Sequence, residues 1–290
     1  MIMLGLGAYE ISVITAMGVA VIFALSLNLI TGFCGQISLG HAAFYGIGAY
    51  TSALLTKAGL PIGVGLLGAV ILAGLVGIIV GFASLRVRHD FLAITTMGVG
   101  FLFVGITRQL DFVGGEMGVS GIPDSGLSKA GFMLFVLLFV ALTILFSLHL
   151  KRSWMGYSFD AIASDEDTAR VIGLDVSRYK LAAFAMGTAL AGLAGALYAH
   201  NVRFIDPESF GFVESITVLA MVVIGGIGSV PGVIFAAALL SILPLWIQFF
   251  DEYKLLLYGG LLFAMMRFSP GGMAGLARRI FPSKTRGVKS

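Results

Sequence analysis

Long runs of apolar residues without a charged side chain constrain the fold of this chain more than any other feature. The run from Ile11 to Ile30 holds no Asp, Glu, Lys or Arg, and about 20 apolar residues in an α-helix span the hydrocarbon core of a bilayer. The runs also lack the alternating pattern of a membrane β-barrel. We therefore predict an all-α membrane protein, a polytopic bundle of about eight to ten transmembrane helices with room for broken or re-entrant helices among them. The candidate spans are Ile11–Ile30, Ile37–Thr56, Ile62–Leu85, Phe91–Leu110, Phe132–Leu150, Leu181–His200, Phe212–Gly228, Gly232–Phe250 and Leu255–Phe268.

The composition agrees with a membrane protein and argues against several kinds of chemistry. Only 11% of the 290 residues are charged, whereas a soluble domain has roughly a quarter. The single cysteine, Cys34, excludes a disulfide within the chain. The sequence has no Walker A loop, no Cys/His cluster with metal spacing and no catalytic constellation. We expect one transmembrane domain over residues 1–290 that is not an enzyme, binds no cofactor or metal and does not itself hydrolyse ATP.

The longest polar interval, Asp160–Lys180, separates two of the apolar runs. It contains five acids and three bases, a composition that belongs in water at the membrane surface. Ser164 followed by Asp167 predicts a capping box, with acids in the first helical turn, and Gly173 is expected to end the helix. A short surface helix of this kind is a docking element; a solvated connecting loop is the alternative. The expected docking residues are Ser164, Asp165, Glu166, Asp167, Ala169, Gly173 and Leu174.

Glycines and polar residues interrupt the helical pattern between Thr31 and Tyr50. Gln36, Ser38 and His41 lie there at membrane depth, where irregular backbone is tolerated only if it is buried in protein or lines a wet cavity. Two interpretations stay open. One is a broken or re-entrant helix beside a translocation path, and the other is a helix packed through small residues with His41 hydrogen-bonded in the core.

Polar groups in later spans are further candidates for such a path. Thr95 and Thr96 follow Asp90, a predicted N-cap, and can bond to their own helix or face a partner. Glu214 is an acid just inside an apolar run, which makes it a functional candidate unless Arg203 neutralises it. The candidate pathway residues are Gln36, Ser38, His41, Thr95, Thr96 and Glu214.

Three other segments carry turn signals. Asp111–Lys129 is glycine-rich and is expected to be a flexible outer loop, either a contact for an extracytoplasmic partner or a plain turn. Asp206 and Pro207 predict a helix start, because proline favours the first helical position. Gly225–Gly232 predicts a sharp reversal on the inner side.

The basic residues indicate an orientation. If Asp160–Lys180 is cytoplasmic, thirteen of the 18 Lys and Arg residues fall on the inner side, as the positive-inside rule requires. The N-terminus is then outside and the C-terminus inside. The basic tail, residues 269–290, is expected to anchor this topology near anionic lipid rather than to bind nucleic acid.

Three stretches resemble the permease subunits of branched-chain amino acid ABC transporters. They are the polar interval with the following LAAFAMGTALAGLAGALYA, the stretch GQISLGHAAFYGIGAY, which is similar to the M-type, LivM-like subunit, and LAMVVIGGIGSVPG. The resemblance extends from about Thr31 to Pro270. The family often has an acid or amide soon after its Thr-Thr pair, and this chain has Gly98 and Gly100 there instead.

The resemblance implies a permease subunit of an ATP-binding cassette importer for branched-chain or hydrophobic amino acids, with Asp160–Lys180 as the coupling helix. The implied partners are a homologous second permease in a heterodimer, two cytoplasmic ATPases and an extracytoplasmic substrate-binding protein. The implied location is the cytoplasmic membrane of a bacterium or archaeon. Similar importers carry urea, amides or other amino acids, and a self-contained channel or facilitator is the alternative from another class.

Overall fold

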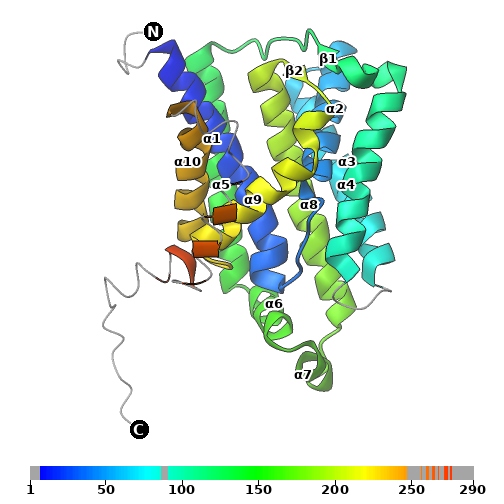
Figure 1. The fold of residues 1–290 in the computed structure, drawn as a ribbon, viewed down its shortest axis with the longest axis vertical. Coiled ribbons are helices and arrows are strands. Elements are labelled where there is room, and N and C mark those ends of the chain that lie inside the picture. The colour runs from blue at the N-terminus through cyan, green and yellow to red at the C-terminus, as the bar shows by residue number, and fades with distance from the viewer. Residues whose placement is uncertain are drawn as a thin grey trace.

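A computed structural model describes residues 7–85 and 91–246 and, beyond them, residues 256, 259–260, 263–264, 267, 271–273 and 275. The described chain forms a bundle of helices with two short strands at one end (Figure 1). The elements are α1 (Ala8–Leu27), the π-helical turn η1 (Asn28–Phe33), α2 (His41–Lys57), α3 (Ile62–Leu85), α4 (Phe91–Gln109), the 3₁₀ turns η2 (Asp111–Val113) and η3 (Gly115–Met117), β1 (Val119–Ser120), α5 (Lys129–Arg152), α6 (Trp154–Ser164), α7 (Glu166–Val171), α8 (Val176–Val202), β2 (Phe204–Ile205), η4 (Glu208–Phe210), α9 (Phe212–Gly225) and α10 (Val230–Trp246).

Six helices in the described part of the chain are long and apolar enough to cross a membrane. They are α1 with η1, α3, α4, α5, α8, and α9 with η4. The prediction of an all-helical membrane bundle is confirmed. α2 and α10 are shorter, at 17 residues each. The predicted span Leu255–Phe268 and the basic tail fall mostly outside the described residues, as does Asp90.

Helix α8 lies in the centre of the bundle, packed against α1, α2 and α3. Small residues let these helices approach closely, as is common between membrane helices. A Cβ atom on Gly195 of α8 would lie 1.8 Å from the carbonyl oxygen of Tyr45 in α2. On the facing side, a Cβ on Gly48 would lie 2.1 Å from the Gly192 carbonyl oxygen. The glycine-rich composition therefore serves backbone contact between α2 and α8.

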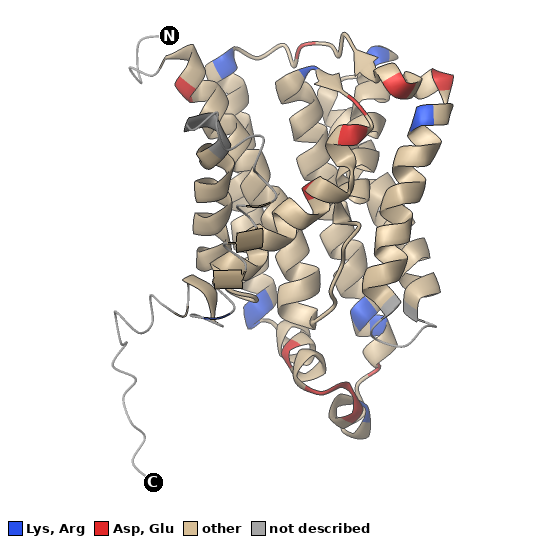
Figure 2. Cartoon of the chain, viewed as in Figure 1, with Lys and Arg blue, Asp and Glu red and all other residues tan. Residues whose placement is uncertain are grey.

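The two ends of the bundle differ in structure. α6 and α7 project from one end, while β1 and β2 pair antiparallel at the other (Figure 1). Most charged residues gather at these two ends, and few lie at mid-height (Figure 2). The segment Asp111–Lys129 is more structured than a plain turn, because it contains η2, η3 and β1, and Lys57 donates to the Ser120 carbonyl at 3.1 Å.

The other predicted turns are mixed in outcome. The reversal at Gly225–Gly232 is confirmed, since α9 ends at Gly225 and α10 begins at Val230. The helix start at Asp206 and Pro207 is confirmed in part: these residues lead into the 3₁₀ turn η4, with which the span Glu208–Gly225 begins, but α9 itself begins only at Phe212. Asp206 accepts a hydrogen bond from the Ser209 amide at 2.8 Å, which stabilises the start of this turn.

Candidate functional site

The polar interval folds into the end of α6, the short helix α7 and the start of α8. Asp165 alone joins α6 to α7, with an extended backbone at φ −162°. Its carboxylate accepts hydrogen bonds from the amides of Asp167 at 2.9 Å and Thr168 at 3.1 Å. These backbone donors hold the pKa of Asp165 below its ordinary value. Asp165 is therefore the N-cap of α7.

The predicted capping box at Ser164 is wrong. Ser164 is the last residue of α6, and its hydroxyl donates to the Asp160 carbonyl at 2.8 Å. A residue that is still helical cannot adopt the extended conformation of an N-cap. The extended Asp165 takes that role one position later.

Gly173 ends α7 as predicted. Its φ is +90°, a left-handed conformation that glycine adopts without a steric penalty. The Gly173 amide donates to the Arg170 carbonyl at 3.0 Å, and the Leu174 amide donates to the Ala169 carbonyl at 3.1 Å. This pair of bonds is a Schellman motif, and the partly buried Leu174 packs against the core.

Helix α7 has one buried face and one exposed face. Ala169 is 1% exposed and lies against the bundle, whereas Val171 is 87% exposed and Ile172 is 67% exposed. Glu166 also faces inward: it forms an ion pair with Lys180 of α8, and the two side chains are 14% and 11% exposed. Arg170 contacts Glu166 at 3.3 Å as well. The exposed tip of α7 thus consists of two apolar side chains, Val171 and Ile172.

Between η1 and α2 the chain leaves the helical conformation over residues 35–40. Gly35 has a φ of +72°, and a Cβ there would lie 3.2 Å from Cα and Cβ of Ala163 in α6. The Gln36 amide donates to the Ile30 carbonyl at 3.1 Å, and Thr31 donates to the Gln36 carbonyl at 2.9 Å. We call residues 35–40 the break. The predicted break in the helix is confirmed, its place beside a translocation path stays a prediction, and the predicted span Ile37–Thr56 is helical only from His41.

The break contacts three helices, α6 through Gly35 and α8 and α4 through hydrogen bonds. The Gln36 side-chain nitrogen donates to the Lys180 carbonyl of α8 at 3.0 Å. The Leu39 amide donates to the Thr96 hydroxyl of α4 at 3.1 Å. At the start of α2, the Ala42 amide donates to the Ser215 hydroxyl of α9 at 3.1 Å. The N-terminal ends of α2 and α9 therefore meet inside the bundle.

The core interpretation of His41 is confirmed as well. His41 is fully buried, and its Nε2 lies 2.8 Å from Oγ of Ser26 in α1. The Ser26 hydroxyl also reaches the Phe23 carbonyl at 2.6 Å, so His41 supplies the hydrogen through Nε2. Its Nδ1 and the hydroxyl of buried Ser38 have no hydrogen-bond partner among the described residues.

The structure thus brings four of the six candidate pathway residues together at the break: Gln36, Ser38, His41 and Thr96. Thr95 is half-buried beside Thr96. Glu214 is half-buried in the first turn of α9, next to Ser215. Arg203, the possible partner considered for Glu214, forms an ion pair with Asp124 at 2.6 Å.

Sequence reasoning missed several residues of this region. Ser26, Ser215 and Asn28 each form bonds that join elements, and the Asn28 side chain accepts from the Gly228 amide at 2.9 Å. A buried polar residue in an apolar run is a usable signal for such partners. Among the described residues, no group of three or more His, Cys, Asp or Glu could hold a metal ion.

The known proteins to which this chain is similar are permease proteins of branched-chain amino acid transport systems. The model of one family, the permease component of the branched-chain amino acid transport system, matches residues 10–266. The chain is 36% identical to the high-affinity branched-chain amino acid transport system permease protein LivM of Salmonella typhimurium, over 95% of this chain and 72% of that protein.

Two further relatives extend the comparison. The chain is 26% identical to the probable branched-chain amino acid transport permease protein LivM of Methanocaldococcus jannaschii, over 88% of this chain and 90% of that protein. It is 23% identical to the high-affinity branched-chain amino acid transport system permease protein LivH of Salmonella typhimurium, over 88% of this chain and 90% of that protein. No solved structure matches the chain.

Proposed function

The chain belongs to the permease component family of branched-chain amino acid transport systems, and we propose that it forms one half of the membrane pathway of an ATP-driven importer for leucine, isoleucine and valine. In this proposal α7 is the coupling helix that binds a cytoplasmic ATPase. The break is the part of the pathway that responds to it.

The exposed tip of α7 is the observation that carries the docking proposal. Val171 and Ile172 are 87% and 67% exposed at the end of a helix that projects beyond the bundle (Figure 1). Two adjacent apolar side chains in water are unfavourable unless a partner covers them. The N-cap at Asp165 and the Schellman motif at Gly173 define both ends of this short helix, so the tip is presented in a fixed conformation.

A continuous set of contacts joins α7 to the break. Glu166 of α7 pairs with Lys180 of α8, and the Lys180 carbonyl accepts from Gln36. Ala163 of α6 packs directly on Gly35. A displacement of α7 by an ATPase would therefore act on the backbone just before α2.

The break suits a neutral pathway. α1 and η1 together have 26 residues, or about 39 Å of helix, whereas the 17 residues of α2 give about 25 Å. The start of α2 at His41 consequently lies well inside the bundle rather than at its edge. The Ser38 hydroxyl there has no hydrogen-bond partner among the described residues, and Ile37 is 54% exposed, a mixture that suits an amino acid with an apolar side chain.

The other partners and the location follow from the family and the charges. Relatives of both kinds, LivM and LivH, match this chain and occur in one organism, which supports a heterodimer with a homologous second permease. We propose two cytoplasmic ATPases and an extracytoplasmic binding protein as the remaining subunits. Lys151, Arg152, Arg170, Arg178 and Lys180 stand at the α7 end, which supports a cytoplasmic location for that end and for the C-terminus.

The docking proposal is tested by Val171→Asp in the tagged chain, co-expressed with its operon partners. We expect the variant to reach the membrane but to lose the co-purifying ATPase, because a charge replaces the apolar tip. Met117→Asp is the matched control, since Met117 is 88% exposed at the opposite end of the bundle. Equal ATPase recovery from both variants would overturn the docking site. A wild-type chain that purifies without any ATPase and conducts leucine alone would support the channel alternative.

A further inference from the structure

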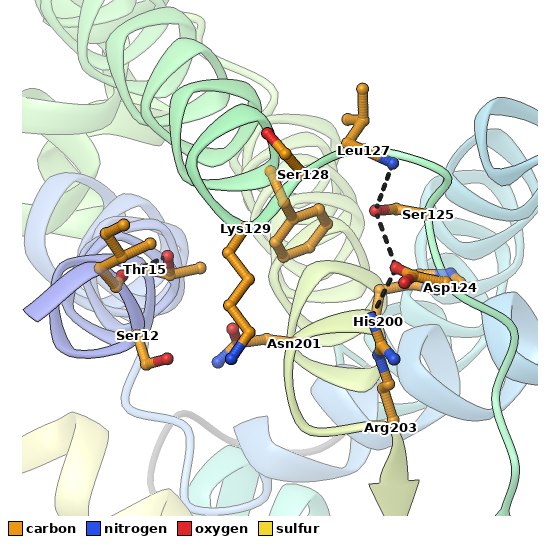
Figure 3. A pocket seen from close by; sticks show the side chains of 12 residues that line it. Ser12, Thr15, Asp124, Ser125, Leu127, Ser128, Lys129, His200, Asn201 and Arg203 are labelled. Carbon is orange, nitrogen blue, oxygen red and sulfur yellow. Dashed lines mark hydrogen bonds and ion pairs between the residues drawn. The ribbon is translucent and has the colours of Figure 1, made fainter. Parts of the chain in front are cut away.

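A cavity of about 550 Å³ lies at the end of the bundle opposite α7. The first turns of α1 and α5, the end of α8 and the segment before α5 surround it (Figure 3). Its volume is within the range of small-molecule sites, roughly 300–1,000 Å³. We propose that this cavity binds the amino acid as a zwitterion on the outer side, before it enters the pathway. The inference rests on the proposed import function and deepens it.

The cavity has a donor for a carboxylate in Lys129. In Figure 3 the Lys129 side chain points from the start of α5 towards Asn201, in the space between α1 and α8. No acid forms an ion pair with Lys129 among the described residues. A free ammonium beside the first turn of a 24-residue helix is a favourable place for a negative group. Lys129 is therefore the group that we assign to the substrate carboxylate.

The cavity also has acceptors for an ammonium group. Asp124 pairs with Arg203 through Oδ1 at 2.6 Å, which leaves its second carboxylate oxygen for another donor. In α1, the hydroxyls of Ser12 and Thr15 donate to the carbonyls of Ala8 and Ile11. Their hydrogens are thus in use, and their oxygens remain acceptors. Donors and acceptors for both ends of an α-amino acid line one cavity.

Apolar side chains complete the lining. Ile11, Leu127 and Phe132 border the same cavity, and Phe132 is 7% exposed. They provide the surface on which an aliphatic side chain can be buried. A free carboxylate or phosphate would need only the cations, whereas the acceptors and the apolar wall together fit a hydrophobic amino acid.

The cavity is connected to the helix that starts at the break. His200 of α8 lines it and is 5% exposed, and its Nε2 lies 3.0 Å from Oγ of Ser52 in α2. α2 begins at His41, next to the break. A ligand in the cavity therefore sits one side chain away from α2.

The test is leucine binding to the complete transporter in nanodiscs, without binding protein and without ATP. We expect Lys129→Gln to weaken leucine binding by about tenfold or more, as the loss of a charge-assisted hydrogen bond does. Lys57→Gln is the control, because Lys57 is an exposed lysine on the same end that donates to Ser120 and does not line the cavity. Co-purification of the ATPase reports on folding and assembly in each variant.

Two leucine analogues separate the two recognition elements. Leucinamide lacks the carboxylate, so Lys129→Gln should abolish the preference of the wild type for leucine over leucinamide. The compound 4-methylpentanoate lacks the ammonium, so Asp124→Asn should reduce the preference for leucine over this acid. Unchanged preferences in both variants, with the ATPase still bound, would overturn the zwitterion site while leaving the importer proposal intact. Leucine binding that disappears when phosphatidylglycerol replaces phosphatidylcholine would also overturn the proposal, because the cavity would then be a site for a lipid headgroup.

Discussion

Asp165 shows how much one residue contributes to the polar segment. It is the entire connection between α6 and α7, and its carboxylate holds two amides of the first turn of α7. The carboxylate form is the one that these amides favour, so the pKa of Asp165 is lowered. The capping contribution is present above the ordinary pKa of an aspartate, about 3.9. It is lost as the pH falls through the lower pKa of the folded chain.

We predict that Asp165→Ala increases hydrogen exchange at the Asp167 and Thr168 amides at neutral pH. Asp165→Asn should leave these amides protected, because asparagine is also a good N-cap, and should remove the loss of protection at acidic pH. Exchange followed by mass spectrometry on the purified complex measures both effects. Equal exchange in the alanine variant and the wild type would show that packing of Ala169, and not the cap, holds α7.

At the scale of elements, α2 is the helix on which the separate sites converge. Its start is held by Ser26 of α1 and Ser215 of α9, and its far end by His200 of α8. The break before it is tied to α8 through Gln36. Contacts from the α7 segment, which we propose as the coupling helix, and from the cavity at the other end of the bundle thus reach the same helix from opposite ends.

We predict that Gln36→Leu uncouples ATP hydrolysis from uptake. Gln36 is 4% exposed, and leucine fills a similar volume without donating to the Lys180 carbonyl. The complex should assemble and hydrolyse ATP, while leucine uptake per ATP falls several-fold in proteoliposomes. The magnitude follows from losing one hydrogen bond of about 1 kcal/mol at a junction between two elements.

Thr143→Val is the control for this variant. Thr143 is 2% exposed, and its hydroxyl donates within its own helix, to the Phe139 carbonyl at 2.8 Å. The Thr143→Val substitution removes a buried hydrogen bond within one helix, whereas Gln36→Leu removes a hydrogen bond between two elements. A similar fall in uptake per ATP for both variants would mean that general destabilisation, and not the link between Gln36 and Lys180, is responsible.

At the scale of the whole molecule, the two ends have different tasks in this proposal. The α7 end carries the docking tip, and the opposite end carries β1, β2 and the cavity (Figure 1). Between them lies a bundle whose outer helices expose apolar side chains, for example Ile79 of α3 at 68% and Leu102 of α4 at 63%. Such faces suit lipid or the second permease.

The orientation is testable because Cys34, the single cysteine, is 1% exposed and should not react. We predict that Met117→Cys is labelled by a membrane-impermeant maleimide on intact cells. Val171→Cys, expressed without the ATPase so that the tip is uncovered, should be labelled only after the cells are permeabilised. The reverse pattern would place α7 outside and refute the coupling role.

The family and the helical bundle could be predicted from the sequence, because both depend on local patterns. An uncharged apolar run makes a membrane helix wherever it occurs, and a glycine such as Gly173 ends a helix through its own φ. The same holds for the reversal at Gly225–Gly232, whose glycines at 226 and 228 have positive φ. Motifs such as GQISLGHAAFYGIGAY likewise carry the family in consecutive residues.

Only the tertiary structure decided which polar residues meet. The sequence placed Glu166 among the docking residues, yet its half-buried side chain pairs with Lys180, and Arg203 pairs with Asp124. Each of the two interpretations of this segment was right in part, since the chain is broken at residues 35–40 and His41 is a hydrogen-bonded core residue. Helix periodicity describes one segment at a time, whereas the bond from Gln36 to Lys180 joins residues 144 positions apart. Such contacts depend on how closely α2, α8 and their neighbours pack, which no local pattern specifies.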